Sequence, residues 1–172
     1  MDAAHFVLGA YLGFLWCFTR IFVRAPSGRQ RFNVLGALNA VTHQLITITN
    51  ETYINSQSVG QLLEKIAGLG LSVPITLIMD NARYQRCKYV SEIATRLNID
   101  ILFLPPYSPN LNLIERLWKF VKKECLYSTY YENFQLFKQA ITVCLSETTG
   151  RHKSSLDTLL TLSFQSFQNL NL

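Results

Sequence analysis

Short runs of apolar and β-branched residues dominate the first fifty positions of the chain. They lie at residues 3–13, 14–23, 31–38 and 44–49, and the turn-forming residues Pro26-Ser27-Gly28 separate the second run from the third. Runs of this length and composition predict β-strands, so we expect a meander of short strands. The uncharged stretch at residues 6–19 is shorter than the roughly 20 residues that span a bilayer, and we assign it to core strands.

From Ser56 the spacing of apolar residues changes to that of a helix. Val59, Leu62, Leu63 and Ile66 recur at intervals of three or four residues until Gly68, which predicts a helix that ends there. A short apolar run at 75–79, a helical pattern at 82–97 and a second apolar run at 99–104 follow. Strand, helix and strand in this order predict a parallel pair joined by a right-handed crossover.

The remainder of the chain is predicted to be helical. Helical patterns cover residues 113–126, 132–146 and 156–167, without an internal repeat or a linker long enough to divide the chain. We therefore expect a single α/β domain over residues 1–172.

Composition adds little to this pattern. The chain is 49% hydrophobic and 16% charged, which is typical of an ordinary globular domain rather than a disordered or collagen-like segment. A net charge of +5 permits an anionic partner without naming one. The four cysteines form no Cys-x-x-Cys pair, so the sequence predicts neither a zinc site nor a disulfide framework and favours a reducing compartment.

Three carboxylates stand out because of where the pattern places them. Asp80 follows the apolar run 75–79, Glu115 opens the helix that begins near Leu113, and Asp2 precedes the first apolar run. Acids that converge can hold two divalent ions, which align and stabilise the oxygens of an in-line phosphoryl transfer. The 34 residues between Asp80 and Glu115 have room for a helix, a strand and a turn, so the layout favours an enzyme that cuts and joins DNA.

Each carboxylate also has a simpler interpretation. Asp80-Asn81 is a common turn and helix N-cap pair, and Asn112 with Glu115 fits a capping box in which the carboxylate binds a backbone amide. A residue as close to an end as Asp2 is usually frayed. On a helical projection, Glu115 shares one face with four bases, and this face suits either DNA phosphates or plain solvent. These bases are Arg116, Lys119, Lys122 and Lys123.

One block of the sequence is distinctive enough to indicate a family. Pro105-Pro106-Tyr107-Ser108-Pro109-Asn110-Leu111-Asn112-Leu113-Ile114-Glu115 resembles the segment that carries the third acid of mariner-like insertion-sequence transposases, the DDE endonuclease group. Residues 77–84 are similar to their second-acid block, and residues 1–6 and 29–37 to their first strands. The resemblance covers nearly the whole chain.

The resemblance implies a ribonuclease H-like fold, with a central mixed five-stranded sheet flanked by helices. It also implies that Asp2, Asp80 and Glu115 bind two Mg²⁺ or Mn²⁺ ions, cut transposon ends and join them to target DNA. The implied partners are DNA, further copies of the chain on that DNA and a separately encoded helix-turn-helix part, with no membrane. The implied location is the cytoplasm, on the nucleoid.

Three departures from the family pattern accompany the resemblance. Asn110 and Leu113 stand where relatives often have Asp and Pro, and Gln85 stands where many have His. The chain also starts one residue before the first acid, without the helix-turn-helix domains of such transposases, which indicates an N-terminally truncated catalytic domain. Two alternatives therefore stay open: an inactive remnant that binds DNA or a partner transposase, and another nuclease of this fold such as a junction resolvase.

Overall fold

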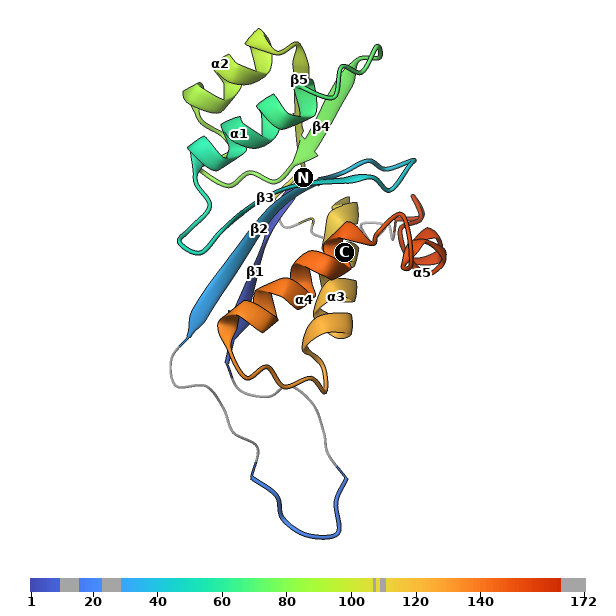
Figure 1. Cartoon of the computed structure of the whole chain (residues 1–172). Helices are drawn as coiled ribbons and strands as arrows, with labels where there is room; N and C mark the ends of the chain where they lie inside the picture. Colours follow the sequence, from blue (N-terminus) through green and yellow to red (C-terminus); the bar gives the residue numbers. More distant parts are fainter. Residues whose placement is uncertain (10–15, 23–28, 107, 109–110, 165–172) are drawn as a thin grey trace, which may run out of the picture.

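The computed structural model describes residues 1–9, 16–22, 29–106, 108 and 111–164 (Figure 1). The first three strands form an antiparallel sheet in the order β1-β2-β3, as the meander predicted. Within it, Asp2 pairs with Gly36 and Leu35 pairs with Ile48. The strands are β1 (Asp2–Leu8), β2 (Gln30–Leu38) and β3 (Leu45–Asn50).

A second, separate pair of strands corrects one expectation. β4 (Ile75–Met79) and β5 (Ile99–Phe103) pair in parallel, as predicted, but they form a two-stranded sheet rather than part of one five-stranded sheet. Directly before β1, the Met1 amino group donates to the carbonyl oxygen of Ile78 in β4 at 2.5 Å. Among the described residues no further hydrogen bond joins the two strands, so the ladder is not continuous.

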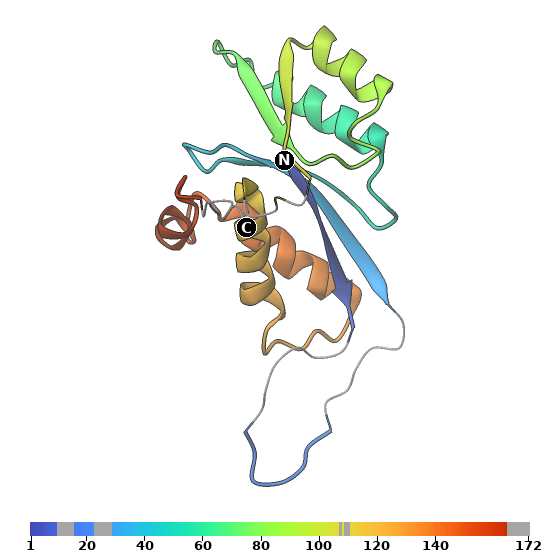
Figure 2. The same ribbon diagram turned by 180° about the vertical axis from the view of Figure 1, so that it is seen from behind.

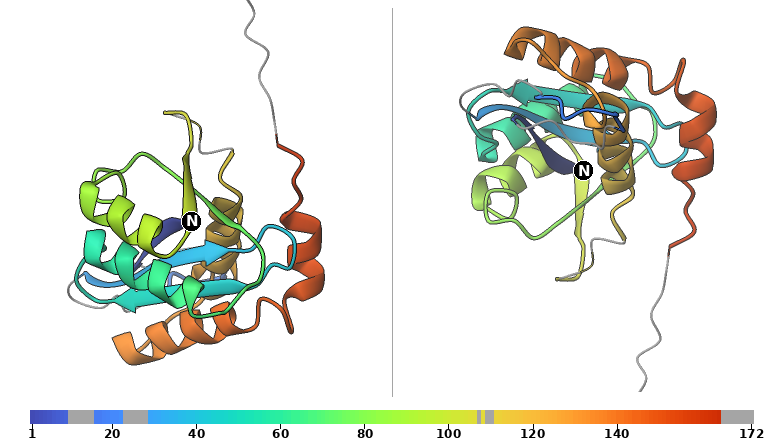
Figure 3. Two further views of the ribbon diagram at one scale, coloured as in Figure 1. Left: turned by 90° about the horizontal axis from the view of Figure 1, so that it is seen from above. Right: turned by 90° about the horizontal axis from the view of Figure 1, so that it is seen from below.

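Helices cover both faces of the three-stranded sheet (Figures 1 and 3). One pair of helices packs with β4 and β5 on one side, and a second pair covers the other side (Figure 2). The helices are α1 (Ser56–Ala67), α2 (Lys88–Arg96), α3 (Leu113–Leu126), α4 (Phe134–Ser146) and α5 (Lys153–Leu159). The alternation of side chains along β1 and β2 therefore supplies two cores, one on each face.

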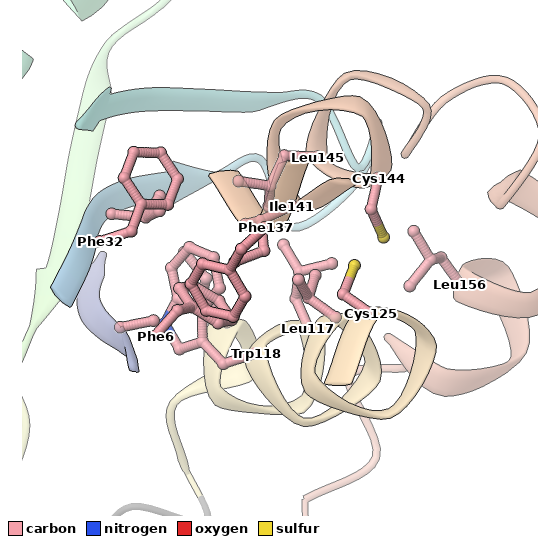
Figure 4. Close-up of a cluster of buried hydrophobic side chains, with 14 of the residues drawn as sticks. Phe6, Phe32, Leu117, Trp118, Cys125, Phe137, Ile141, Cys144, Leu145 and Leu156 are labelled. Atoms are coloured by element: carbon pink, nitrogen blue, oxygen red, sulfur yellow. The ribbon is translucent and has the colours of Figure 1, made fainter. Parts of the chain in front are cut away.

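The core on the α3 and α4 side is rich in aromatic residues. Phe6 of β1 and Phe32 of β2 pack against Phe137 of α4 and Trp118 of α3 (Figure 4). Cys125 and Cys144 lie in the same cluster, where α3 meets α4, and Leu156 of α5 closes it. This core attaches α3 to the strand that carries Asp2.

The core on the opposite face joins the two sheets. Met1, which precedes β1, and Leu35 and Ala37 of β2 pack with Met79 of β4 and with the buried face of α1. That face consists of Val59, Leu62, Leu63 and Ile66, the residues whose spacing predicted the helix. Asn55 caps α1 by accepting a hydrogen bond from the Ser58 N–H at 3.0 Å. The apolar spacing, the N-cap and the buried face therefore all indicate the same helix.

Two expected elements differ from the structure. Residues 14–23 were expected to form a strand, but residues 16–22 form none, and Trp16 is 99% exposed; the rest of that range lies outside the described residues. α2 begins at Lys88 rather than near Ala82, because residues 82–87 form turns and the N-cap Cys87 is extended. The last helix covers Lys153–Leu159 rather than 156–167, whose final residues are likewise not described.

Candidate active site

Asp2 lies at the start of β1, on the strand face that α3 covers. Ala4, Phe6 and Leu8, which share this face, are buried against α3 and α4. The indole Nε1 of Trp118 on α3 donates a hydrogen bond to Oδ2 of Asp2 at 3.1 Å. The carboxylate is therefore half-buried and held from α3, rather than frayed as its position in the chain suggested.

Asp80 directly follows β4 and begins the turns that lead to α2. Its Oδ1 accepts from the Ala82 N–H at 3.3 Å, which is a local turn contact. The side chain of Asn81 donates to the carbonyl oxygen of Leu104 at 2.5 Å, so the ends of β4 and β5 are tied together. Because Cys87 is the N-cap of α2, Asp80 does not cap that helix.

Glu115 lies half-buried in the first turn of α3. The capping-box interpretation of this residue is wrong, because the Asn112 side chain makes no cap hydrogen bond. Instead, Nδ2 of Asn112 donates to the carbonyl oxygen of Met1 at 3.5 Å. Asn112 thus connects the start of α3 to the start of β1, and this contact brings the turn with Glu115 toward Asp2.

The charge of Asp80 acts on the carboxyl groups of both Asp2 and Glu115, and the charge of Asp2 also acts on Glu115. Burial raises the pKa of the Asp2 carboxyl, the backbone N–H of Ala3 opposes this, and the charge of Asp80 raises the pKa further. Burial also raises the pKa of the Glu115 carboxyl, and the charges of Asp2 and Asp80 add to the effect while Lys119 opposes it. Like charges held near one another in a partly desolvated site favour a bound cation or a shared proton.

Carboxylate oxygens are the donors that Mg²⁺ and Mn²⁺ prefer, so the residue types fit the expected ions. The arrangement is nevertheless open. In the part of the chain that the structure describes, no three His, Cys, Asp or Glu side chains are grouped closely enough to hold a metal ion. The three acids share an electrostatic environment and come from adjoining elements, but they do not form a closed ligand shell.

Two residues beside the acids were missed by sequence reasoning. Burial raises the pKa of the Tyr84 hydroxyl, and the charges of Asp80 and Asp2 raise it further, so this side chain lies within range of their charges. Trp118 was not singled out from the sequence, although it follows Glu115 by one helical turn. That spacing was the available signal, since residues three apart are neighbours on a helix.

The basic face of α3 divides into two parts. Lys119, Lys122 and Lys123 are exposed, as a phosphate-binding surface requires. Arg116 instead donates to the carbonyl oxygens of Leu159 at 3.3 Å, Thr161 at 2.8 Å and Ser163 at 2.9 Å. Its guanidinium also lies over the Phe164 ring, 5.3 Å from the centroid. Arg116 therefore binds the last residue of α5 and the segment after it, a role that its charge did not predict.

With this geometry established, comparison with known proteins identifies the family. A family model described as DDE superfamily endonuclease matches residues 2–138, which is most of the chain and includes all three acids. The chain belongs to the DDE superfamily endonucleases. No curated protein sequence matches it.

Solved structures place this DDE endonuclease chain in a fold class. It resembles Mos1 transposase in a paired-end complex with the left transposon end (TM-score 0.59, 11% identity, 95% of this chain and 55% of that one). A Mos1 mariner paired-end complex with Mn gives TM-score 0.58 at 11% identity, over 96% and 56% of the two chains. The catalytic core of BIV integrase gives TM-score 0.52 at 13% identity, over 86% and 83%.

These likenesses support the expected ribonuclease H-like α/β class. The chain spans about half the length of the Mos1 chains it matches. Among its described helices, none is long and apolar enough to cross a membrane.

Proposed function

We propose that this DDE endonuclease chain cleaves DNA strands at the ends of a mobile element and joins them to target DNA, with Asp2, Asp80 and Glu115 as its metal ligands. The observation that carries the proposal is that α3, which bears Glu115, is joined to the start of β1 through the Trp118 and Asn112 hydrogen bonds, where the charge of Asp80 acts on both Asp2 and Glu115. Family membership over residues 2–138 supports the same reaction class.

Each acid would contribute oxygen donors from a different element. Divalent ions, when bound, would align and stabilise the attacking and leaving oxygens of an in-line displacement. Asp2 approaches from the sheet, while Asp80 approaches from the end of β4 and Glu115 from the first turn of α3. Asp2 and Glu115 lie on a strand and a helix, and ligands on such elements are better preorganised than ligands on loops.

The exposed lysines Lys119, Lys122 and Lys123 supply a DNA contact on the same helix as Glu115. Lysine and arginine side chains that bind phosphates provide most of the sequence-independent affinity for DNA. The Mos1 structures contain a paired-end complex and a transposon end. We accordingly propose DNA as the partner and an assembly of several copies on it.

The decisive experiment compares matched carboxylate variants in a nicking assay on supercoiled plasmid DNA. We expect nicking with Mg²⁺ or Mn²⁺ by the wild-type chain, and its loss in Asp80→Asn and in Glu115→Gln. Glu124→Gln on α3 and Asp100→Asn on β5 change exposed acids away from the three ligands and should retain activity. Nicking that persists in Asp80→Asn and Glu115→Gln would overturn the assignment.

A second candidate function rests on the open arrangement of the acids, which form no closed ligand group within the described residues. An inactive chain that only binds DNA would show affinity that decreases with salt, and no nicking with either metal ion. Wild-type nicking that requires Asp80 excludes this candidate. The same assay therefore separates the two.

A further inference from the structure

Trp118 makes a side-chain hydrogen bond that joins α3 to the carboxylate of Asp2. Its ring is 4% exposed, and its Nε1 lies 3.1 Å from Oδ2 of Asp2. The hydrogen bond connects residues 116 positions apart in the chain. An indole N–H only donates and carries no charge, so it orients a carboxylate without competing with a cation for the site.

We propose that Trp118 is a positioning residue for metal binding, which holds Oδ2 of Asp2 so that the carboxylate presents its other oxygen to a divalent cation. This inference rests on the proposed function, because it takes Asp2 to be a metal ligand. Groups that hydrogen-bond to metal ligands fix ligand orientation, and their mutation typically weakens metal binding by about 10- to 100-fold.

The ring of Trp118 packs closely against Gly36 of β2. Gly36 is the register partner of Asp2 on β2, and a methyl group at position 36 would lie 2.8 Å from Cη2 of Trp118. The same methyl group would lie 3.2 Å from Cδ1 of Ile114, which is one turn earlier on α3. The buried ring therefore occupies the space that glycine leaves open, directly beside the strand position that pairs with Asp2.

The same helix turn also carries Glu115. Trp118 follows Glu115 by three residues, so both lie on the same turn of α3. This turn carries the Glu115 carboxylate itself and contacts the Asp2 carboxylate through the indole hydrogen bond. A shift of α3 would move both acids together. This shared support explains how two ligands far apart in the sequence keep a constant relationship to each other.

The first test uses Trp118→Phe, which keeps an aromatic ring but removes the N–H. We expect the full chain with this change to bind Mn²⁺ about 10- to 100-fold more weakly in calorimetric titrations, with its far-ultraviolet circular dichroism unchanged. Asp2→Asn retains an acceptor for the indole but lacks the charge, and it should abolish the binding that Trp118→Phe only weakens.

The second test needs no variant and uses the indole N–H signals in a ¹⁵N-labelled wild-type chain. The chain has two tryptophans, Trp118 and Trp16, and Trp16 is 99% exposed, so it serves as an internal reference. Saturation with Mg²⁺ should shift the Trp118 signal and leave the Trp16 signal in place.

The outcomes separate the two proposals. Equal metal affinity in wild type and Trp118→Phe, or an unmoved Trp118 signal at saturating Mg²⁺, overturns the positioning role and leaves the proposed function standing. A wild-type chain that binds neither Mg²⁺ nor Mn²⁺ overturns the proposed function itself.

Discussion

Gly36 of β2 and Trp118 of α3 are in such close contact that the strand has no room for a side chain at this position. A Cβ atom there would lie 2.8 Å from Cη2 and 3.0 Å from Cζ2 of the indole. Backbone conformation does not require this glycine, since its φ is not positive. The glycine therefore serves the close approach of α3 to the sheet, at the strand position that faces Asp2.

We expect Gly36→Ala to destabilise the fold by about 1–3 kcal/mol, the usual cost of overpacking a core, because the indole must move. Thermal and urea unfolding would measure this loss. Gly9→Ala is the matched control, since nothing lies within 4 Å of a Cβ at that position. A Gly36→Ala chain as stable as wild type would contradict the packing described.

The double variant Lys122→Gln, Lys123→Gln tests the exposed basic face of α3. Because each phosphate contact contributes about 0.9 to the salt slope of duplex DNA binding, losing two contacts should lower that slope by roughly 2. Fluorescence anisotropy at several salt concentrations would measure it. Lys88→Gln on α2, whose amine pairs with Glu92 at 3.6 Å, is the control that should leave the slope unchanged.

Arg116→Ala tests the contact between α3 and the segment after α5. Loss of its hydrogen bonds to the carbonyl oxygens of Leu159, Thr161 and Ser163 should lower the free energy of unfolding by about 1 kcal/mol. It should also make residues 159–163 more accessible to protease and to hydrogen exchange. Lys119→Ala, on the same helix, should not do so. If Arg116→Ala lowers the salt slope of DNA binding and leaves residues 159–163 protected, Arg116 is a DNA contact instead.

The hydroxyl of Tyr131 donates to the carbonyl oxygen of Cys125 at 2.6 Å, and burial raises the pKa of Tyr131 to about 12 from its usual 10.0. Between these pH values the folded chain holds a proton that the unfolded chain has lost, so stability must fall as pH rises from 10 to 12.

We expect Tyr131→Phe to lower the free energy of unfolding by about 1 kcal/mol at pH 8. The stability of this variant should also decline less steeply than that of the wild type between pH 10 and 12. Urea unfolding at a series of pH values would measure both effects. The exposed Tyr127 offers a control in Tyr127→Phe, which should follow the wild-type curve. The prediction is wrong if Tyr131→Phe retains the full alkaline decline.

Local patterns predicted the elements whose apolar spacing is regular. The α1 pattern of Val59, Leu62, Leu63 and Ile66 is the face that the structure buries, and β4 lies at the predicted positions. The pattern failed at residues 16–22, because an aromatic-rich composition favours a strand but does not supply a neighbouring strand to pair with. Trp16 and Phe18 are exposed there instead.

In the candidate site, too, local features were predictable from the sequence and long-range contacts were not. The placement of Asp80 after a buried strand and of Glu115 in a first helical turn was readable, because each depends on a few neighbouring residues. Two interpretations needed the structure to decide them. Asn112 binds the Met1 carbonyl instead of capping with Glu115, and Arg116 binds backbone carbonyls in addition to any DNA contact.

By itself the sequence predicted most of the strands and helices in their order, indicated the family and pointed to the three acids, since periodicity and motif spacing are local properties of the chain. Only the tertiary structure decided that β4 and β5 form their own sheet, that Trp118 donates to Asp2 and that Gly36 makes room for the ring. Such contacts depend on the packing of elements distant in the chain, whose energy is shared among many residues and leaves no signature in any short segment.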